Sequence, residues 1–197
     1  MRHSERQASG RGSWRLLGIG LLSLIGLSSP APARAAACEV PDFTPQTPGP
    51  DRAGTGFPLN IGASLRATVP TGFERLRFSS HAIVLGYPGG GSAVIGLETA
   101  ESIAVIGAGT SPADFYRNVF SGADTLGCEV LAGLGLATMD YRITQTRGKV
   151  KIFAYGQGTT HQFYAISDDT PQVVVGGRFT GVDRTAFDDI LSSIAPL

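Results

Sequence analysis

From Leu65 onward the chain alternates apolar with small or polar residues, which is the two-residue period of half-buried strands. The first run, Leu65–Val69, stops at Pro70, and Thr71-Gly72 completes a turn. The same alternation predicts further strands at 81–87, 92–98 and 102–106. The Pro88-Gly89-Gly90-Gly91 segment is expected to be a loop.

A β meander is predicted in the second half of the chain, with strands at 136–146, 150–157, 161–167 and 172–180. Gly158-Thr159 is typical of a two-residue hairpin, because glycine readily takes the positive φ of a type II′ turn. This turn pairs Tyr155 with Gln162 and Phe153 with Tyr164 on one face of the hairpin. The other face carries Ile152, Ala154, Phe163 and Ala165. Because both faces are apolar, we expect the sheet to be covered on both sides.

Two amphipathic helices complete the pattern. The first begins at Ser111, whose hydroxyl can cap exposed backbone amides, and has Pro112 and Asp114 in its first turn. The second spans about 183–194 and places Phe187, Ile190, Leu191 and Ile194 on one face. The sequence therefore predicts one α+β domain over 57–197, in which helices flank both faces of an antiparallel β-sheet.

The first 37 residues have the pattern of a secretory signal peptide. Arg11 and Arg15 precede the apolar run 16–27, and small residues at 33–37 fit the subsites of a signal peptidase. We expect cleavage after Ala37, with Ala35 as second choice. The alternative is a retained anchor, but the apolar run is shorter than the roughly 20 residues that a membrane span needs. A periplasmic or secreted protein with no membrane span in the mature chain is expected.

Cleavage after Ala37 removes five arginines and one glutamate, which changes the formal charge from 0 to −4. A mildly acidic surface gives phosphate no long-range attraction, so we expect no nucleic acid partner.

Residues 38–56 are rich in proline and glycine and contain few residues suited to a core, so we expect an extended leader. The two cysteines, Cys38 and Cys128, both follow the cleavage site, and an even number in an oxidising compartment predicts a disulfide. Lipidation of Cys38 and a pair of free thiols are the alternatives. A lipoprotein signal is disfavoured because Arg34 and a Pro/Ala stretch separate Cys38 from the apolar run.

Catalytic, nucleotide and metal signatures do not stand out in the sequence. The glycine-rich segments 86–91 and 107–110 lack the spacing of phosphate-binding loops. His81 and His161 are expected at exposed or edge positions, and the mature chain has no G-x-S-x-G motif. The neighbouring carboxylates at 168–169 and 188–189 diverge and lack metal-site spacing. We therefore expect neither a cofactor nor a metal.

The order of elements and two short motifs resemble the Mog1/PsbP-like superfamily. Pro70-Thr71-Gly72-Phe73 is similar to the P-x-G-[FW] that closes the first strand in that family, and residues 187–194 are similar to its final F-x-x-I-L-x-S-I helix. The resemblance covers about 57–197. It implies an α/β/α sandwich and a binding or assembly module, without common catalytic residues to carry over. The export signal favours a bacterial envelope branch.

We therefore expect an exported, non-enzymatic domain that binds another envelope protein as an accessory, chaperone-like or immunity-type factor. The alternative is a periplasmic hydrolase of an envelope polymer or a small ester. A hydrolase of this kind would bring His81 or His161 together with serine and aspartate in a closed pocket.

The candidate partner-binding surface is the hairpin face that carries Phe153, Tyr155, Gln162 and Tyr164. Lys149 and Lys151 flank this face, and tyrosines with nearby cations are common interface anchors. Such a role requires the tyrosines to be accessible to solvent. The other interpretation is that the carboxy-terminal helix covers this face as part of the core.

Overall fold

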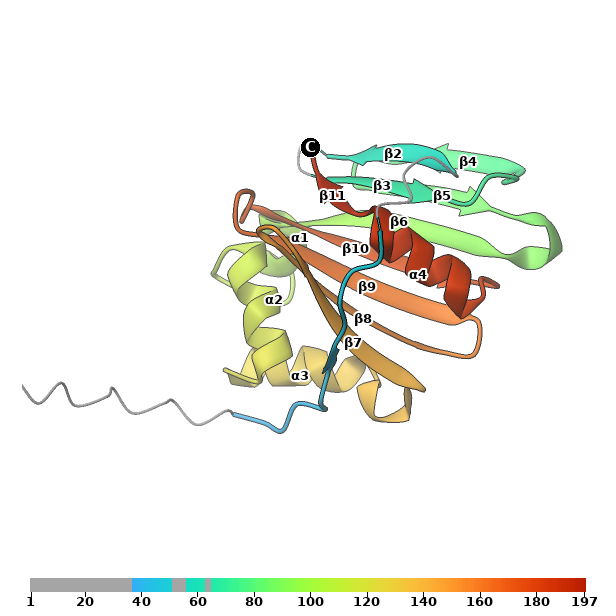
Figure 1. Cartoon of the computed structure of the whole chain (residues 1–197). Helices are drawn as coiled ribbons and strands as arrows, with labels where there is room; N and C mark the ends of the chain where they lie inside the picture. Colours follow the sequence, from blue (N-terminus) through green and yellow to red (C-terminus); the bar gives the residue numbers. More distant parts are fainter. Residues whose placement is uncertain (1–36, 51–55, 63–64) are drawn as a thin grey trace, which may run out of the picture. The chain divides into compact units, whose positions relative to one another are not determined.

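The computed structural model describes residues 37–50, 56–62 and 65–197. The predicted signal peptide at 1–37 therefore lies outside the described residues except for Ala37. The described chain is a mixed α+β fold dominated by a large β-sheet, with a smaller sheet and four α-helices (Figure 1).

The large sheet has eight strands, and all neighbours are antiparallel except β1, which runs parallel to β7. In spatial order the strands are β1 (Thr44–Pro45), β7 (Tyr141–Arg147), β8 (Val150–Gln157), β9 (Thr160–Ser167), β10 (Val173–Thr180), β6 (Ser92–Thr99), β5 (Ala82–Gly86) and β4 (Arg75–Phe78). The small sheet has the order β11 (Ala195–Pro196), β3 (Leu65–Val69) and β2 (Phe57–Ile61).

The helices are α1 (Ala100–Ala104), α2 (Pro112–Ser121), α3 (Thr125–Gly133) and α4 (Arg184–Ser193), with short 3₁₀ turns η1 (Pro88–Gly90) and η2 (Leu136–Thr138). The Ser111 hydroxyl accepts a hydrogen bond from the Asp114 amide and caps α2. The Asp183 carboxylate accepts one from the Ala186 amide and caps α4. Both predicted helices are thus confirmed, with side-chain caps at their first turns.

The turn at Gly158 sets the hairpin register that the sequence predicts. Gly158 has φ +57°, and β8 pairs with β9 so that Phe153 lies opposite Tyr164 and Tyr155 opposite Gln162. Successive residues of a strand point to opposite faces, so β8 contributes to two separate cores.

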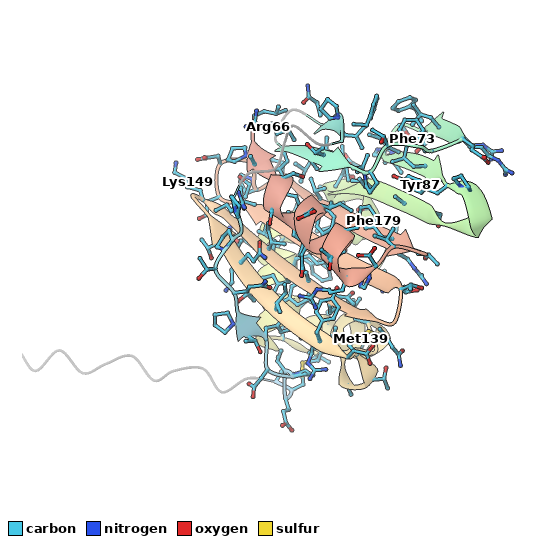
Figure 2. The ribbon with its side chains drawn as sticks, turned by 45° about the vertical axis from the view of Figure 1, so that its right-hand side comes forward. Arg66, Phe73, Tyr87, Met139, Lys149 and Phe179 are labelled. Atoms are coloured by element: carbon cyan, nitrogen blue, oxygen red, sulfur yellow. A yellow bond between two sulfur atoms is a disulfide. The ribbon has the colours of Figure 1, made fainter. Side chains whose placement is uncertain are left out.

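One apolar cluster joins α4 and the small sheet to Ile152, Ala154, Phe163 and Ala165 of the hairpin. The other cluster joins α1, α2 and α3 to Phe153, Tyr155 and Ile166. Phe73, in the motif after β3, links the two sheets: its ring packs edge-on against Phe57 and Tyr87, with centroids 5.2 and 6.4 Å apart (Figure 2).

The predicted strand at 102–106 is wrong, because residues 102–104 belong to α1 and residues 105–106 form the turn that follows it. Thr99 and Ser102 form a reciprocal capping box there, and each side chain bonds to the backbone amide of the other residue. Caps at both residues favour a helix over the strand that the apolar alternation suggested. The strand predicted from 136 begins only at Tyr141, since η2 precedes it, and α3 was not predicted.

The described part of the proline-rich segment, residues 38–50, is extended, as predicted, but it packs against the domain. Its β1 pairs with β7, and the Gln46 amide donates to the Thr144 carbonyl at 2.8 Å. Phe43 packs edge-on against Phe120 and Phe153. The described residues of the segment are at most partly buried, as expected of a segment with few core residues, but Cys38, Val40 and Phe43 pack against the core. The packed part of the chain therefore begins before Phe57.

Cys38 and Cys128 form a disulfide, with Cα atoms 5.9 Å apart. The bond attaches the start of the proline-rich segment to α3. In the structure Cys38 and Cys128 are bonded to each other, so neither is a free thiol or carries a lipid.

Candidate functional site

The hairpin face predicted to bind a partner lies largely in the core. Tyr155 is 0% exposed and Phe153 is buried, whereas Gln162 and Tyr164 are half-buried. The Phe120 ring stacks on Phe153 at 4.2 Å, and Tyr116 stacks on Tyr164 at 4.8 Å. The prediction that these four side chains form an accessible surface is therefore wrong, because α2 lies over the hairpin. The cover is α2 and not the carboxy-terminal helix that the sequence suggested.

Beyond Gln162 the same sheet face continues onto strands that are open to solvent. Gln162 lies opposite Arg178, Arg178 opposite Val94, Val94 opposite Val84, and Val84 opposite Arg77. Directly opposed residues of antiparallel strands share a face, so these side chains form one row across the sheet. Val84 and Val94 are 37% and 40% exposed, and Arg77 and Arg178 are exposed.

Two glycines beside this row make a shallow trough in the sheet. Gly96 lies opposite Gly176, and the trough holds about 180 Å³. The Tyr164 ring forms one wall, since a Cβ built on Gly176 would lie 3.5 Å from its edge. Glycines at facing strand positions expose backbone to whatever lies on the sheet. We call the trough and the row from Gln162 to Arg77 the open strip.

The open strip ends at β4, whose four residues are all exposed. β4 is the last strand of the sheet, and Phe78 is 69% exposed. No ion pair joins Arg75, Arg77 or Arg178 to a carboxylate within the described ranges. An unpaired strand edge is a template for another strand, and its charges select against partners of the same sign.

His161 is buried, which corrects the expectation of an exposed or edge histidine. It is 1% exposed, and its ring stacks on Phe187 at 4.8 Å. Nε2 lies 2.9 Å from the Val182 carbonyl and must donate, so Nδ1 accepts from the Tyr141 hydroxyl at 2.9 Å. Gly156 allows this packing, because a Cβ there would lie 2.5 Å from Nδ1.

This environment predicts a stability that depends on pH. Burial lowers the pKa of His161 from its ordinary value of 6.5, so below about pH 6.5 the unfolded chain binds more protons than the folded one. The free energy of unfolding should therefore fall as the pH drops through this range, by at most about 1.4 kcal/mol per pH unit for one proton. Above about pH 6.5, His161 should not make the free energy of unfolding depend on pH.

Urea denaturation between about pH 5.5 and 7.5 measures the effect. His161→Gln should remove the slope, whereas substitution of the exposed His81 by glutamine should retain it. An unchanged slope in His161→Gln would show that another group is responsible.

His81 is exposed, and its Nδ1 lies 2.8 Å from the hydroxyl of the adjacent Ser80. In the described chain neither histidine meets serine and aspartate in a closed pocket. The described residues also contain no group of three or more potential His, Cys, Asp or Glu metal ligands. Among those same residues no helix has the length and apolar character of a membrane span.

No protein-family model and no curated protein matches the chain. Among solved structures, it is similar to a crystal structure from Bacteroides thetaiotaomicron VPI-5482 at 1.50 Å resolution, with 10% sequence identity and a TM-score of 0.40. The alignment covers 73% of this chain and 49% of that one, so this chain spans about half the length of its structural neighbour.

The sequence interpretation missed most of the open strip. It identified Gln162 and Tyr164, which belong to the strip, but not Arg77, Val84 or Arg178. A signal was present in the two arginines two residues apart at 75 and 77, which place like charges on one side of a strand. The sequence does not reveal that β6 pairs with β10, and this pairing brings these arginines and Arg178 onto one face.

Proposed function

We propose that the chain is an exported, non-enzymatic binding domain that acts on another protein of the cell envelope, as an accessory, chaperone-like or immunity-type factor. The observation that carries this proposal is the open strip, an uncovered sheet face that ends at an exposed edge strand. Its Arg77 and Arg178, and the neighbouring Arg75, form no ion pair among the described residues. The disulfide supports a periplasmic or secreted location, because such bonds persist in oxidising compartments.

The proposal includes a Mog1/PsbP-like arrangement, with helices on both faces of the sheet. This arrangement is supported by neighbouring residues of β8 that pack into different apolar clusters. Ile152 packs in the cluster of α4, and Phe153 packs in the cluster of α2. Flanking helices leave the far strands uncovered, which is where the open strip lies.

The partner that fits the open strip is a protein with an extended acidic segment. Added beside β4, such a segment would form backbone hydrogen bonds and present side chains with a two-residue period. Carboxylates on one side would face Arg75 and Arg77, and apolar residues on the other would contact Leu76 and Phe78. A second copy of this chain fits poorly, because its own β4 would bring arginines against arginines.

Nucleic acid is disfavoured as the partner by the formal charge of −4 after cleavage. The hydrolase alternative gains no support from the histidines, because both ring nitrogens of His161 are engaged and His81 lies at the surface.

Photocrosslinking in cells tests the proposal. A photoreactive residue at Val84, on the open strip, should give a discrete adduct with one envelope protein, whose sequence should contain an acidic extended segment. The control position is Val105, which is 86% exposed at the end of α1 and should give no such adduct.

Charge reversal on the strip should then weaken the purified complex. Arg77→Glu combined with Arg178→Glu should raise the Kd at least about tenfold, or 1.4 kcal/mol, and binding should also weaken with added salt. Arg66→Glu reverses an exposed charge on the small sheet and is the matched control. Equal binding by both variants would exclude the open strip as the interface.

A further inference from the structure

A larger recess lies beside α2, away from the open strip. It holds about 490 Å³ between α2, the β7–β8 turn and the loop after β9. This volume is in the range of small-molecule sites. Its floor is apolar and consists of Phe120, Phe153 and Ile166, where the Phe120 and Phe153 rings are stacked within 8° of parallel.

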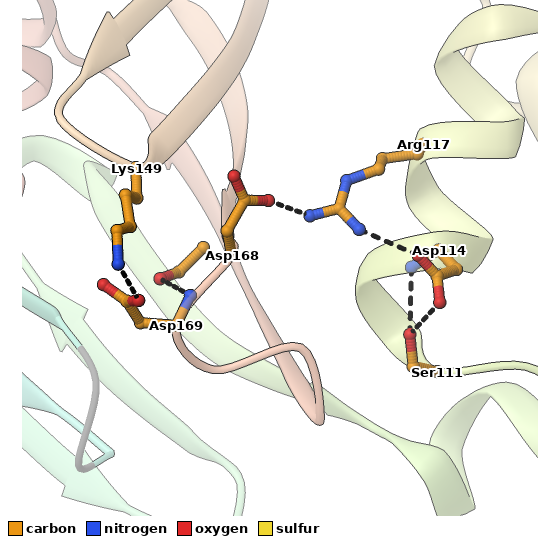
Figure 3. A network of polar contacts seen from close by, with 7 residues as sticks. Ser111, Asp114, Arg117, Lys149, Asp168 and Asp169 are labelled. Carbon is orange, nitrogen blue, oxygen red and sulfur yellow. Dashed lines mark hydrogen bonds and ion pairs between the residues drawn. The ribbon is translucent and has the colours of Figure 1, made fainter.

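Most charges around this recess are paired with one another (Figure 3). Arg117 lies between Asp168 and Asp114, at 2.8 Å from the latter, and Lys149 pairs with Asp169 at 2.7 Å. The Ser111 hydroxyl and Arg117 lower the pKa of Asp114, which keeps its carboxylate ionised. These two cations and three carboxylates carry a net charge of −1, and both cations are already engaged by carboxylates.

Lys151 is the exception among the charged residues lining the recess. Its ammonium lies 4.9 Å from the centroid of the Phe153 ring, and no ion pair joins it to a carboxylate in the part of the chain that the structure describes. One unpaired positive charge thus stands above an apolar aromatic floor.

We propose that this recess binds a small monoanion with a flat apolar body, of which an aromatic monocarboxylate is the simplest form. The carboxylate pairs with the Lys151 ammonium, and the aromatic body lies against Phe120, Phe153 and Ile166. A neutral analogue lacks the ion pair. A dianion brings a second charge, for which the recess has no free cation, since Arg117 and Lys149 are already held by aspartates.

Titration calorimetry with 2-naphthoate, 2-naphthamide and 2,6-naphthalenedicarboxylate tests the charge preference on the full mature protein. 2-Naphthoate should bind at least about tenfold more tightly than the other two, which corresponds to 1.4 kcal/mol. Equal binding of 2-naphthoate and the amide would overturn the proposal, as would undetectable binding of all three probes.

Variants test the residue assignment. Lys151→Met should weaken 2-naphthoate binding at least tenfold and leave the amide unchanged, with a melting temperature near that of the wild type because Lys151 is exposed. Lys149→Met should change the affinity less than twofold, since Lys149 is committed to Asp169. Equal losses in the two variants would contradict the assignment of the free charge to Lys151.

Ring-proton NMR shifts locate the ligand. Bound 2-naphthoate should shift the Phe120 and Phe153 signals, and shifts confined to other aromatic residues would place the ligand elsewhere and refute the site. Arg178→Met should leave 2-naphthoate binding intact, while Lys151→Met should leave the protein complex intact. These two variants separate a failure of this recess from a failure of the open strip.

Discussion

Removing the disulfide by Cys128→Ser is expected to lower the free energy of unfolding by about 3–5 kcal/mol. Cys38 and Cys128 are 90 residues apart, and closing so long a loop removes much of the conformational freedom of the unfolded chain. For a domain of this size the loss corresponds to a fall of roughly 10 °C in Tm. The effect should be large because the bond also holds β1 and Phe43 against the sheet.

Thermal denaturation with and without reductant measures this loss. Reductant should lower the Tm of the wild type to that of the variant and should not change the variant. The double variant Cys38→Ser/Cys128→Ser should melt with the single one. Two free thiols in protein isolated from the envelope, or a diacylglycerol group on Cys38, would contradict the disulfide.

Tyr155→Ala is expected to destabilise the protein by about 3–5 kcal/mol. The side chain is fully buried in the cluster formed with α2, so its removal leaves a cavity that the surrounding residues fill only in part. Tyr155→Phe keeps the ring and removes a buried hydroxyl that makes no well-aligned hydrogen bond within the described residues, although Tyr164 lies close enough to raise its pKa. This variant should range from neutral to about 1 kcal/mol more stable than the wild type.

Equilibrium urea denaturation of the two variants gives both values. A small loss in Tyr155→Ala would show that the ring is accessible and would restore the hairpin face as a candidate interface. A large loss in Tyr155→Phe would show that the hydroxyl has a partner in solution.

The local parts of the fold were predictable because neighbouring residues determine them. Gly158-Thr159 sets the hairpin register, and Ser111 and Asp183 each cap the helix that follows. The apolar alternation then assigns each hairpin residue to a face. These signals act within a few residues, so a sequence reveals them without knowledge of the rest of the molecule.

The prediction errors have several causes, both local and long-range. The segment 102–106 has β-branched residues that favour a strand, but the caps at Thr99 and Ser102 favour a helix, to which residues 102–104 belong. α3 contains Gly127 and Gly133, which weaken its helical signal. The two-residue strand β1 contains a proline and forms only because β7 offers an edge.

The candidate site depended most on contacts between distant segments. The sequence placed aromatic residues on one hairpin face, but only the position of α2 decides that Phe153 and Tyr155 are core and that Gln162 borders an open surface. The arginines of β4 and β10 are about 100 positions apart in the sequence, and the order β10-β6-β5-β4 brings them together.

Backbone amide exchange, with and without the protein that crosslinks at Val84, tests the proposed interface most directly. An acidic segment added to the sheet edge would protect the amides of β4 (Arg75–Phe78) from exchange. Exchange should slow in β4 and stay unchanged in α2. Unchanged exchange in β4, together with new protection in α2 or around the recess, would contradict the proposed interface.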